Sequence, residues 1–441
     1  MDYLSDPIEK LYQKLLPSAI GSMLTATVAS LIDTVVLSHY LGPVMLSSVS
    51  ICMPIYMVLN ALALLIVSGG ATLCATYLGK NDPQESNRYF TVSAYSVIFI
   101  GLLLTIAGNL FPEELITLLG ANESVWQSTL DYAKVLMKFM VPLMLYCLML
   151  FFVRFDSDPG LALSATGICA VTNLILDILF VGPLNMGASG AALATCLAYT
   201  IATVVGFTHF LKKKNSLRPI KGSVTLNRLR RILAAGLPLS FSQFGMALTT
   251  SVFNVQIMRI AGELYVTVYA IITQLAMCAL AFYEGIPQAA QPILAANFGA
   301  GDRLRVEKAL RMGVLLELIF TGACLILYCM GAKMISSFFS ITEGELLDIC
   351  MEGIRIFALS LPLTGLNMLG MYYLQSRECV LPSAVISLLN GTVLMIACLL
   401  ILSACFGKDG IWWTWFSAQA LTLFYTFFVI KKENRKERQY V

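Results

Sequence analysis

The stretch LAANFGAGDRLR, residues 294–305, resembles the stretch CATYLGKNDPQE, residues 74–85. In each stretch an apolar run ends at a glycine, and an aspartate follows three residues later. The two glycines and the two aspartates each lie 220 positions apart, and the same offset relates several further residues along the chain. These pairs are Gly79 and Gly299, Asp82 and Asp302, Gly42 and Gly262, Pro142 and Pro362, Gly187 and Gly407, Gly190 and Gly410, and Glu123 and Glu343. Because the chain has 441 residues, we predict two copies of one structural unit.

The composition predicts that both copies lie in a membrane. Apolar residues make up 58% of the chain and charged residues 12%, and the mean hydropathy is +0.78. A soluble domain averages about 25% charged residues.

The net charge of +3 is too small to indicate nucleic-acid binding. The 12 cysteines contain no C-x-x-C motif and only two histidines accompany them, which argues against a structural zinc site or a disulfide scaffold.

A bilayer-spanning helix needs about 20 apolar residues, and twelve stretches of the chain meet this length. We therefore predict an all-α integral membrane protein with twelve transmembrane helices in two pseudo-symmetric six-helix bundles. The predicted parts are an N-lobe at 1–211, a basic linker at 212–231, a C-lobe at 232–430 and a tail at 431–441. The predicted spans are 15–40, 44–78, 90–111, 130–154, 160–182, 187–211, 233–261, 265–298, 308–331, 345–375, 380–405 and 410–430.

The distribution of positive charge predicts the orientation of the spans. The 212–231 linker contains eight Lys or Arg residues and no acid, and the 431–441 tail contains five cations. The 112–129 loop contains no cation. Cytoplasmic loops are enriched in Lys and Arg, so we expect the linker and both chain ends to be cytoplasmic, in the cell membrane. A basic linker of this kind also suits acidic lipid or RNA, but an ordinary positive-inside loop explains it more simply.

Four polar side chains are expected at one depth within the first half. Asp33 lies about 10 Å below the outer end of its span, as Asp177 and Thr195 do in theirs. Asn173 precedes Asp177 by four residues, so both side chains share one helix face. Two carboxylates, an amide and a hydroxyl suit a small cation such as Na⁺, or a proton shared between the carboxylates. The alternative is a structural hydrogen-bond network, with Asp33 paired to Ser30 or Ser38.

The second half does not repeat these acids. The residues 220 positions after Asp33, Asn173 and Asp177 are apolar, so ion coupling is expected in the first half alone. These residues are Phe253, Val393 and Ala397.

The second half has acids of its own. Glu284 and Gln288 flank Pro287 in the middle of a span, where the carboxylate would either attract a cationic substrate or hydrogen-bond to a broken helix. Glu317 and Arg259 are weaker candidates, expected to be structurally paired or to reach the membrane surface.

Four motifs of the chain carry a family resemblance. They are LIDTVVLSHYLG at 31–42, TNLILD at 172–177, GASGAALAT at 187–195 and LAANFGAGDRLR at 294–305. Together they resemble the multidrug and toxic compound extrusion (MATE) family, in its DinF-like or MepA-like branch.

The resemblance covers nearly the whole chain and implies export of amphiphilic organic cations in exchange for Na⁺ or H⁺. It also implies a cation site at Asp33, Asn173, Asp177 and Thr195, and a bend of the first span near Pro17. The NorM-like branch differs, because it has an acid early in the seventh span and this chain has none.

Other functions fit the sequence less well. A flippase for lipid-linked saccharides, from the same wider superfamily, remains the alternative, although it would be expected to line its cavity with several Arg or Lys residues. No P-loop is present, since neither Gly79-Lys80 nor Gly407-Lys408 is followed by Ser or Thr. We therefore expect a monomeric transporter that is not an enzyme, needs no cofactor and binds small organic cations but no nucleic acid.

Overall fold

The computed structural model describes residues 1–121, 123, 125–212, 215–339 and 341–439, without the side chains of 42–46, 247 and 437–439. Parts of the predicted linker and tail therefore lie outside the described residues. The described chain is almost entirely helical and contains no strand. Its helices are α1 (Ile8–Gly79), α2 (Pro83–Leu110), α3 (Pro112–Leu118), α4 (Trp126–Lys138), α5 (Met140–Phe155), α6 (Pro159–Val181), α7 (Gly187–Phe207), η1 (Thr208–Leu211), α8 (Leu226–Ile260), α9 (Glu263–Tyr283), α10 (Gly285–Gly299), α11 (Arg303–Phe338), α12 (Glu345–Ser376), α13 (Val380–Leu388), η2 (Leu389–Val393), α14 (Leu394–Phe406) and α15 (Lys408–Gln439).

The helices confirm the predicted all-α membrane fold, with an approximate span count. Among the described residues, ten helical segments are long and apolar enough to cross a membrane. The α4–α5 pair, bent by 55°, is an eleventh if it counts as one span. The predicted span at 345–375 forms α12, which is not among these segments.

The chain forms two compact units. Unit 1 contains Met1–Asp2 and Gly21–Gly236, and unit 2 contains Tyr3–Ile20 and Leu237–Val441. These units differ at their edges from the predicted lobes. The beginning of α1 packs within unit 2, and the basic linker packs within unit 1.

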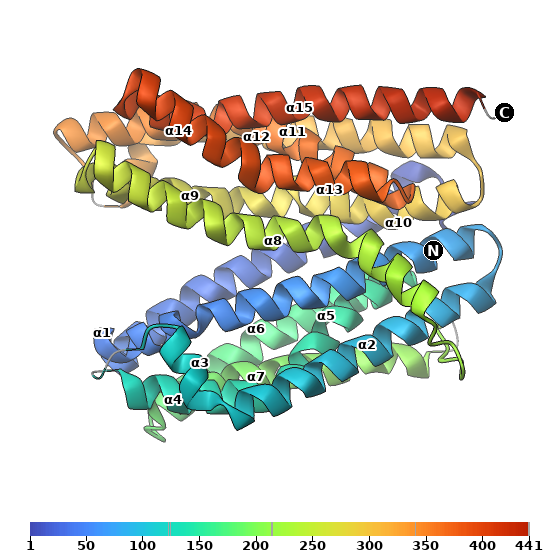
Figure 1. Ribbon diagram of the computed structural model, residues 1–441, viewed down its shortest axis with the longest axis horizontal. Coiled ribbons are helices and arrows are strands. Elements are labelled where there is room, and N and C mark those ends of the chain that lie inside the picture. The colour runs from blue at the N-terminus through green and yellow to red at the C-terminus, as the bar shows by residue number, and fades with distance from the viewer. Residues whose placement is uncertain (122, 124, 213–214, 340, 440–441) are drawn as a thin grey trace. The chain divides into compact units, whose positions relative to one another are not determined.

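Within unit 1, α5, α6 and α7 run alongside one another (Figure 1). The bend between α4 and α5 comes just before Pro142, which has no N–H to continue the hydrogen-bond ladder of α4. The backbones of α1 and the start of α8 approach each other closely in unit 1. A Cβ added to Gly236 would lie 1.8 Å from the Leu65 carbonyl oxygen, and one added to Gly69 would lie 2.0 Å from the Ile232 carbonyl oxygen. Only glycine permits this contact between helix backbones.

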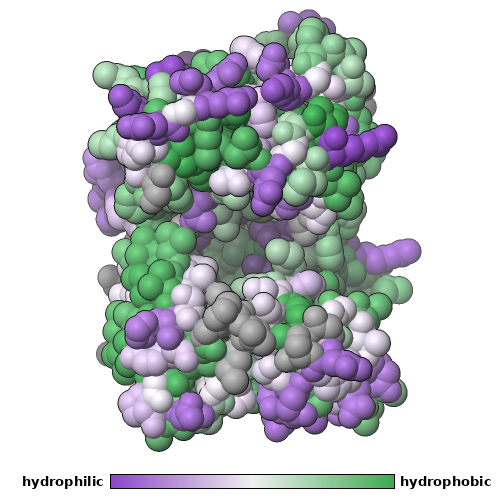
Figure 2. Space-filling view, turned by 90° about the vertical axis from the view of Figure 1, so that its left-hand side faces the viewer, coloured by the Kyte–Doolittle hydropathy of each residue, from purple (hydrophilic) through white to green (hydrophobic). Residues whose placement is uncertain are grey.

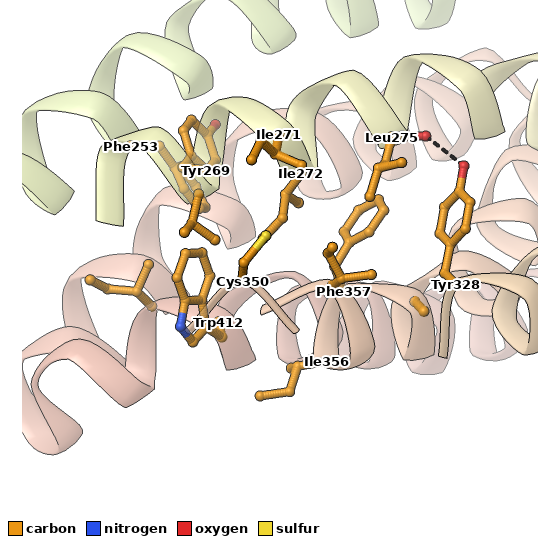
Figure 3. Packing of buried hydrophobic residues seen from close by; sticks show 14 of the residues in the cluster. Phe253, Tyr269, Ile271, Ile272, Leu275, Tyr328, Cys350, Ile356, Phe357 and Trp412 are labelled. Atoms are coloured by element: carbon orange, nitrogen blue, oxygen red, sulfur yellow. Dashed lines mark hydrogen bonds between the residues drawn. The ribbon is translucent and has the colours of Figure 1, made fainter. Parts of the chain in front are cut away.

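Unit 2 has an aromatic and aliphatic core between α8, α9, α11, α12 and α15 (Figure 3). Phe253 stacks on Tyr269 with ring centroids 5.2 Å apart. The Tyr328 hydroxyl donates a hydrogen bond to the Leu275 carbonyl at 3.0 Å, so its polar end is satisfied inside the core. Phe253, the residue that replaces Asp33 in the repeat, is therefore part of an apolar core.

Large hydrophobic side chains also cover the outside of the helices. Figure 2, which looks onto the helix ends at the left of Figure 1, shows hydrophobic areas interspersed with hydrophilic ones. Phe99, Val255 and Phe424 are 67%, 70% and 77% exposed. Exposure of this kind is costly in water and expected in lipid, which supports the membrane assignment.

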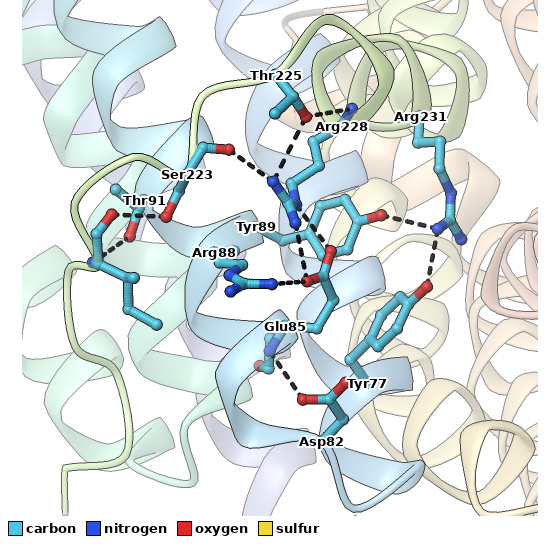
Figure 4. Close-up of polar contacts among 12 residues, drawn as sticks. Tyr77, Asp82, Glu85, Arg88, Tyr89, Thr91, Ser223, Thr225, Arg228 and Arg231 are labelled. Carbon is cyan, nitrogen blue, oxygen red and sulfur yellow. Dashed lines mark hydrogen bonds and ion pairs between the residues drawn. The ribbon is translucent and has the colours of Figure 1, made fainter.

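The basic linker is anchored to α2 and to the end of α1 (Figure 4). The Arg228 guanidinium donates two hydrogen bonds to the Glu85 carboxylate, at 2.7 and 3.0 Å. Arg231 donates to the hydroxyls of Tyr77 and Tyr89, both at 2.8 Å. Arg228 and Arg231 therefore bind specific side chains of α1 and α2, whereas a positive-inside loop needs only to be solvated.

The start of the linker is held by a second polar cluster at the α5–α6 turn. The buried His209 ring contacts Asp156 at 2.6 Å and Asp158 at 3.2 Å, and Lys212 donates to Asp158. Burial alone would raise the pKa of Asp158, but the hydrogen bonds from Lys212 and His209 outweigh it and hold this pKa below its ordinary value.

Replacing Lys212 with Met should therefore lower the melting temperature of the purified protein near neutral pH. An acid with a lowered folded-state pKa stabilises the fold above its unfolded pKa, about 3.9 for Asp, and this stabilisation is lost as the pH falls through the folded value. The difference between wild type and Lys212→Met should thus shrink in acid. Lys221→Met, which changes an exposed lysine of the same linker, serves as the control. A difference that stays constant down to acid pH would contradict the pairing.

Candidate functional site

The polar residues predicted in the first half meet in unit 1. Asp33 lies in α1 and Asp177 in α6, and their carboxyl groups are within hydrogen-bonding reach of each other. Asp177 is fully buried. The Asn173 amide nitrogen lies 2.7 Å from an Asp177 carboxylate oxygen, as the four-residue spacing on α6 predicts.

Thr195 completes the cluster from α7. The Asn173 amide nitrogen lies 3.4 Å from the Thr195 hydroxyl, which itself donates to the Ala191 carbonyl at 3.1 Å. The small residues of GASGAALAT let α7 pack closely on α6, since a Cβ added to Gly190 would lie 3.2 Å from the Phe180 Cβ. This packing brings the hydroxyl to the depth of the carboxyl pair.

The hydrogen bonds of the cluster leave charge uncompensated. One oxygen of Asp33 and one of Asp177 are buried and have no hydrogen-bond donor among the described residues. Ser38, a possible structural partner of Asp33, donates instead to the Val35 carbonyl at 3.4 Å. Two adjacent buried carboxylates repel each other when both are ionised, so the pair is suited to hold a proton or a small cation between them.

A cavity of about 230 Å³ adjoins the cluster in unit 1. Asp33, Asn173 and Thr195 line it, and none of its described lining residues is Lys or Arg. Asp33 and Asn173 also line a second cavity of about 350 Å³, so they stand between two open volumes. The wall of the second cavity is otherwise mostly aliphatic, with Leu24, Val28 and Ile32 among its lining residues.

Four tyrosines in the wall of the first cavity did not emerge from the sequence reasoning. The hydroxyls of two of them lie 3.5 Å apart, and the rings of the other two meet edge to face with centroids 4.7 Å apart. Their faces suit the recognition of an organic cation. Spacing along the sequence does not distinguish such residues from lipid-facing aromatics. They are Tyr56, Tyr132, Tyr146 and Tyr199.

The second-half candidates belong to unit 2. Glu284 falls at the break between α9 and α10, where Pro287 cannot donate to the Tyr283 carbonyl. Gln288 is buried, and its side chain hydrogen-bonds to the Glu284 carboxyl. This contact favours the structural alternative, and a substrate-binding role for both residues stays a prediction. Pro17 lies inside α1, and the bend expected there also stays a prediction.

Comparison with known proteins identifies the fold. The MatE family model matches residues 17–179 and 238–401, one match in each half of the repeat. Two solved structures, described as MATE in the straight and in the bent conformation, superpose with TM-scores of 0.92 and 0.90. They are 20% and 21% identical to this chain, and in both cases 99% of this chain and 98% of the other are covered. The double match confirms the repeat predicted from the glycines and prolines.

Curated relatives span the chain from end to end. The multidrug export protein MepA of Staphylococcus haemolyticus is 24% identical over 421 residues, which cover 94% of this chain and 91% of MepA. MepA of Staphylococcus saprophyticus is 23% identical, with 92% of this chain and 89% of the relative covered. The family model alone covers well over half of the sequence, and the chain belongs to the MatE family.

Proposed function

We propose that the protein is a secondary active exporter of amphiphilic organic cations, driven by inward movement of H⁺ or Na⁺ through the Asp33–Asp177 pair. The observation that carries the proposal is this buried pair, with two oxygens that lack a donor, beside an aromatic cavity. The MepA relatives, whose name describes multidrug export, support the same function. Both chain ends are proposed to be cytoplasmic, in the cell membrane.

The coupling follows from the charge of the pair. An ion drives transport only through its different affinity for two conformations. With the pair empty, two buried negative charges destabilise the conformation seen here, and a bound proton or cation removes this cost. Ion binding therefore favours one conformation, and ion release favours the other.

The cluster offers partners for either coupling ion. The Asn173 amide nitrogen donates to the Asp177 carboxylate in the structure, an arrangement compatible with a proton on the carboxyl pair. A Na⁺ ion would need the Asn173 amide turned so that its oxygen joins those of the two carboxyls and Thr195. Efflux from membrane vesicles under an imposed pH gradient, compared with an imposed Na⁺ gradient, separates the two ions.

Cells that express the protein should tolerate a lipophilic aromatic cation at several-fold higher concentration than cells with an empty vector. The cavity adjoins the Asp33–Asp177 pair and is lined by four tyrosines, and none of its described lining residues is Lys or Arg. Such a lining suits a cation and disfavours a pyrophosphate. Growth at graded drug concentrations measures the effect. If tolerance is unchanged while the protein rescues a strain lacking a lipid-linked saccharide flippase, the flippase alternative is correct.

A further inference from the structure

Glu317, a buried acid of unit 2, has no role in the site described above. One face of α11 is buried along its length, with Ala309, Gly313, Glu317 and Thr321 at intervals of four residues. Glu317 is 0% exposed in the middle of this face. The sequence reasoning expected this side chain to be paired or to reach the membrane surface, and the structure shows neither.

Glu317 points toward the backbone of α12. A Cβ added to Gly365 would lie 2.3 Å from a Glu317 carboxylate oxygen, so the glycine provides the space that the carboxyl group occupies. Three residues earlier, Pro362 interrupts the hydrogen-bond ladder of α12. The carboxyl group therefore lies beside a helix that is already weakened.

Neither oxygen of the Glu317 carboxyl group has a hydrogen-bond partner among the described residues. The titratable neighbour is Tyr12 of α1, and its hydroxyl donates instead to the Ala309 carbonyl at 2.9 Å. Among the described residues of unit 2, the other buried charged side chain is Arg377 of α12, which donates to Tyr373 and to Asn434. Thr321 hydrogen-bonds to the Glu317 backbone carbonyl, and its methyl group faces Gly365.

These surroundings determine the protonation state. An ionised carboxylate with no partner is far more costly to bury than a neutral carboxylic acid, which forgoes only hydrogen bonds. A metal cation would not resolve the cost, because it needs several oxygen ligands and neither oxygen of the carboxyl group has a polar partner among the described residues. No cluster of three His, Cys, Asp or Glu residues exists among the described residues. These surroundings therefore favour the neutral acid over the ionised carboxylate.

We propose that Glu317 is a second proton-carrying site, which binds a proton in the conformation seen here and releases it to water when the packing of α11 against α12 opens. The step forms a carboxylate and a hydrated proton from the carboxylic acid, and the reverse step restores the acid. The proposal rests on the proposed function, since it assigns a second coupling proton to the same transport cycle. It also revises the expectation that only the first half takes part in coupling.

The repeat supports this division of acids between the units. The residue 220 positions before Glu317 is Val97, which is apolar and fully buried. The residue 220 positions after Asp33 is Phe253, also apolar and buried. Each unit thus has an acid at a position where the other unit has a buried hydrophobic side chain.

Infrared spectroscopy of the purified protein tests the protonation directly. At neutral pH we expect a carbonyl stretching band of a protonated carboxyl group that disappears in Glu317→Gln. The band should remain in Glu307→Gln, which changes an exposed glutamate of the same helix that pairs with Arg311. If Glu317→Gln is poorly folded, Glu317→Met provides a second variant of similar size. An unchanged band in a folded Glu317 variant would overturn the proposal.

Proton counting tests the transport role. In weakly buffered solution, binding of a lipophilic aromatic cation to wild type and to Glu307→Gln should release more protons than binding to Glu317→Gln, by roughly one per molecule. Equal release from all three proteins would overturn the second site, whatever the result for Asp33. By contrast, if cells that express wild type gain no drug tolerance over cells with an empty vector, the proposed function is contradicted. The infrared result for Glu317 would then stand independently.

Discussion

Replacing Asp33 with Asn should abolish ion-driven efflux while the protein still folds and inserts into the membrane. The substitution removes the titratable charge and keeps the size and the hydrogen-bonding capacity of the side chain. The carboxyl pair then no longer changes its charge state, so the several kcal/mol that ion binding contributes to one conformation is lost. Asp177→Asn should have the same effect. Efflux of a lipophilic cation from proteoliposomes under a fixed ion gradient measures it.

A matched control comes from the same unit. Asp131, in α4, accepts a hydrogen bond from Gln127 at 2.9 Å near the surface, and Asp131→Asn should transport at the wild-type rate. Asp33→Asn protein that exports at the wild-type rate under the same gradient would place the coupling site elsewhere. The double variant of Asp33→Asn and Glu317→Gln, compared with the two single variants, then shows whether the two acids are coupled, since the effects of independent sites add.

Gly236→Ala should prevent unit 1 from forming its native packing. The new methyl carbon would lie 1.8 Å from the Leu65 carbonyl oxygen, and backbone cannot move aside as a flexible side chain does. Overpacking of this kind costs about 3 kcal/mol or more. We expect loss of the monodisperse peak in size-exclusion chromatography of detergent extracts.

Gly167→Ala tests whether any new methyl group has this effect. Gly167 lies in α6 of the same unit, and a Cβ there would meet nothing within 4 Å. This variant should elute and melt like wild type. A normal elution profile for Gly236→Ala would show that α1 and α8 tolerate a wider separation than the structure has.

The sequence was sufficient to predict the carboxyl pair because each inference depended on local geometry. The four-residue spacing of Asn173 and Asp177 defines one helix face, and the distances to the span ends set the depths of Asp33 and Thr195. The repeat was predictable for a similar reason, because glycines and prolines mark helix ends directly. Neither inference required knowledge of which helices touch.

The features that were missed depend on contacts between helices. A lone glutamate in a span is usually paired, and the sequence does not reveal that both carboxyl oxygens of Glu317 lack a partner among the described residues. Tyrosines occur on lipid-facing surfaces as well as around cavities, so their presence in the sequence does not indicate a cavity. The packing of residues 3–20 within unit 2 was not predicted, because the hydrophobic pattern of α1 is continuous. That pattern gives no sign that the Tyr12 hydroxyl bonds to the Ala309 carbonyl.

The membership of residues 3–20 in unit 2 sets an order of events during biosynthesis. Arg305 donates hydrogen bonds to the carbonyls of Tyr3 and Asp6, and Tyr12 donates to Ala309, so the partners of the first helical turns are made almost 300 residues later. At about 5–20 residues per second, a ribosome needs roughly 15–60 s to reach them. Unit 1 has all its own partners by Gly236 and can assemble in that interval, whereas the start of α1 must wait in the bilayer. The last unit to be translated therefore closes on the first segment of the chain.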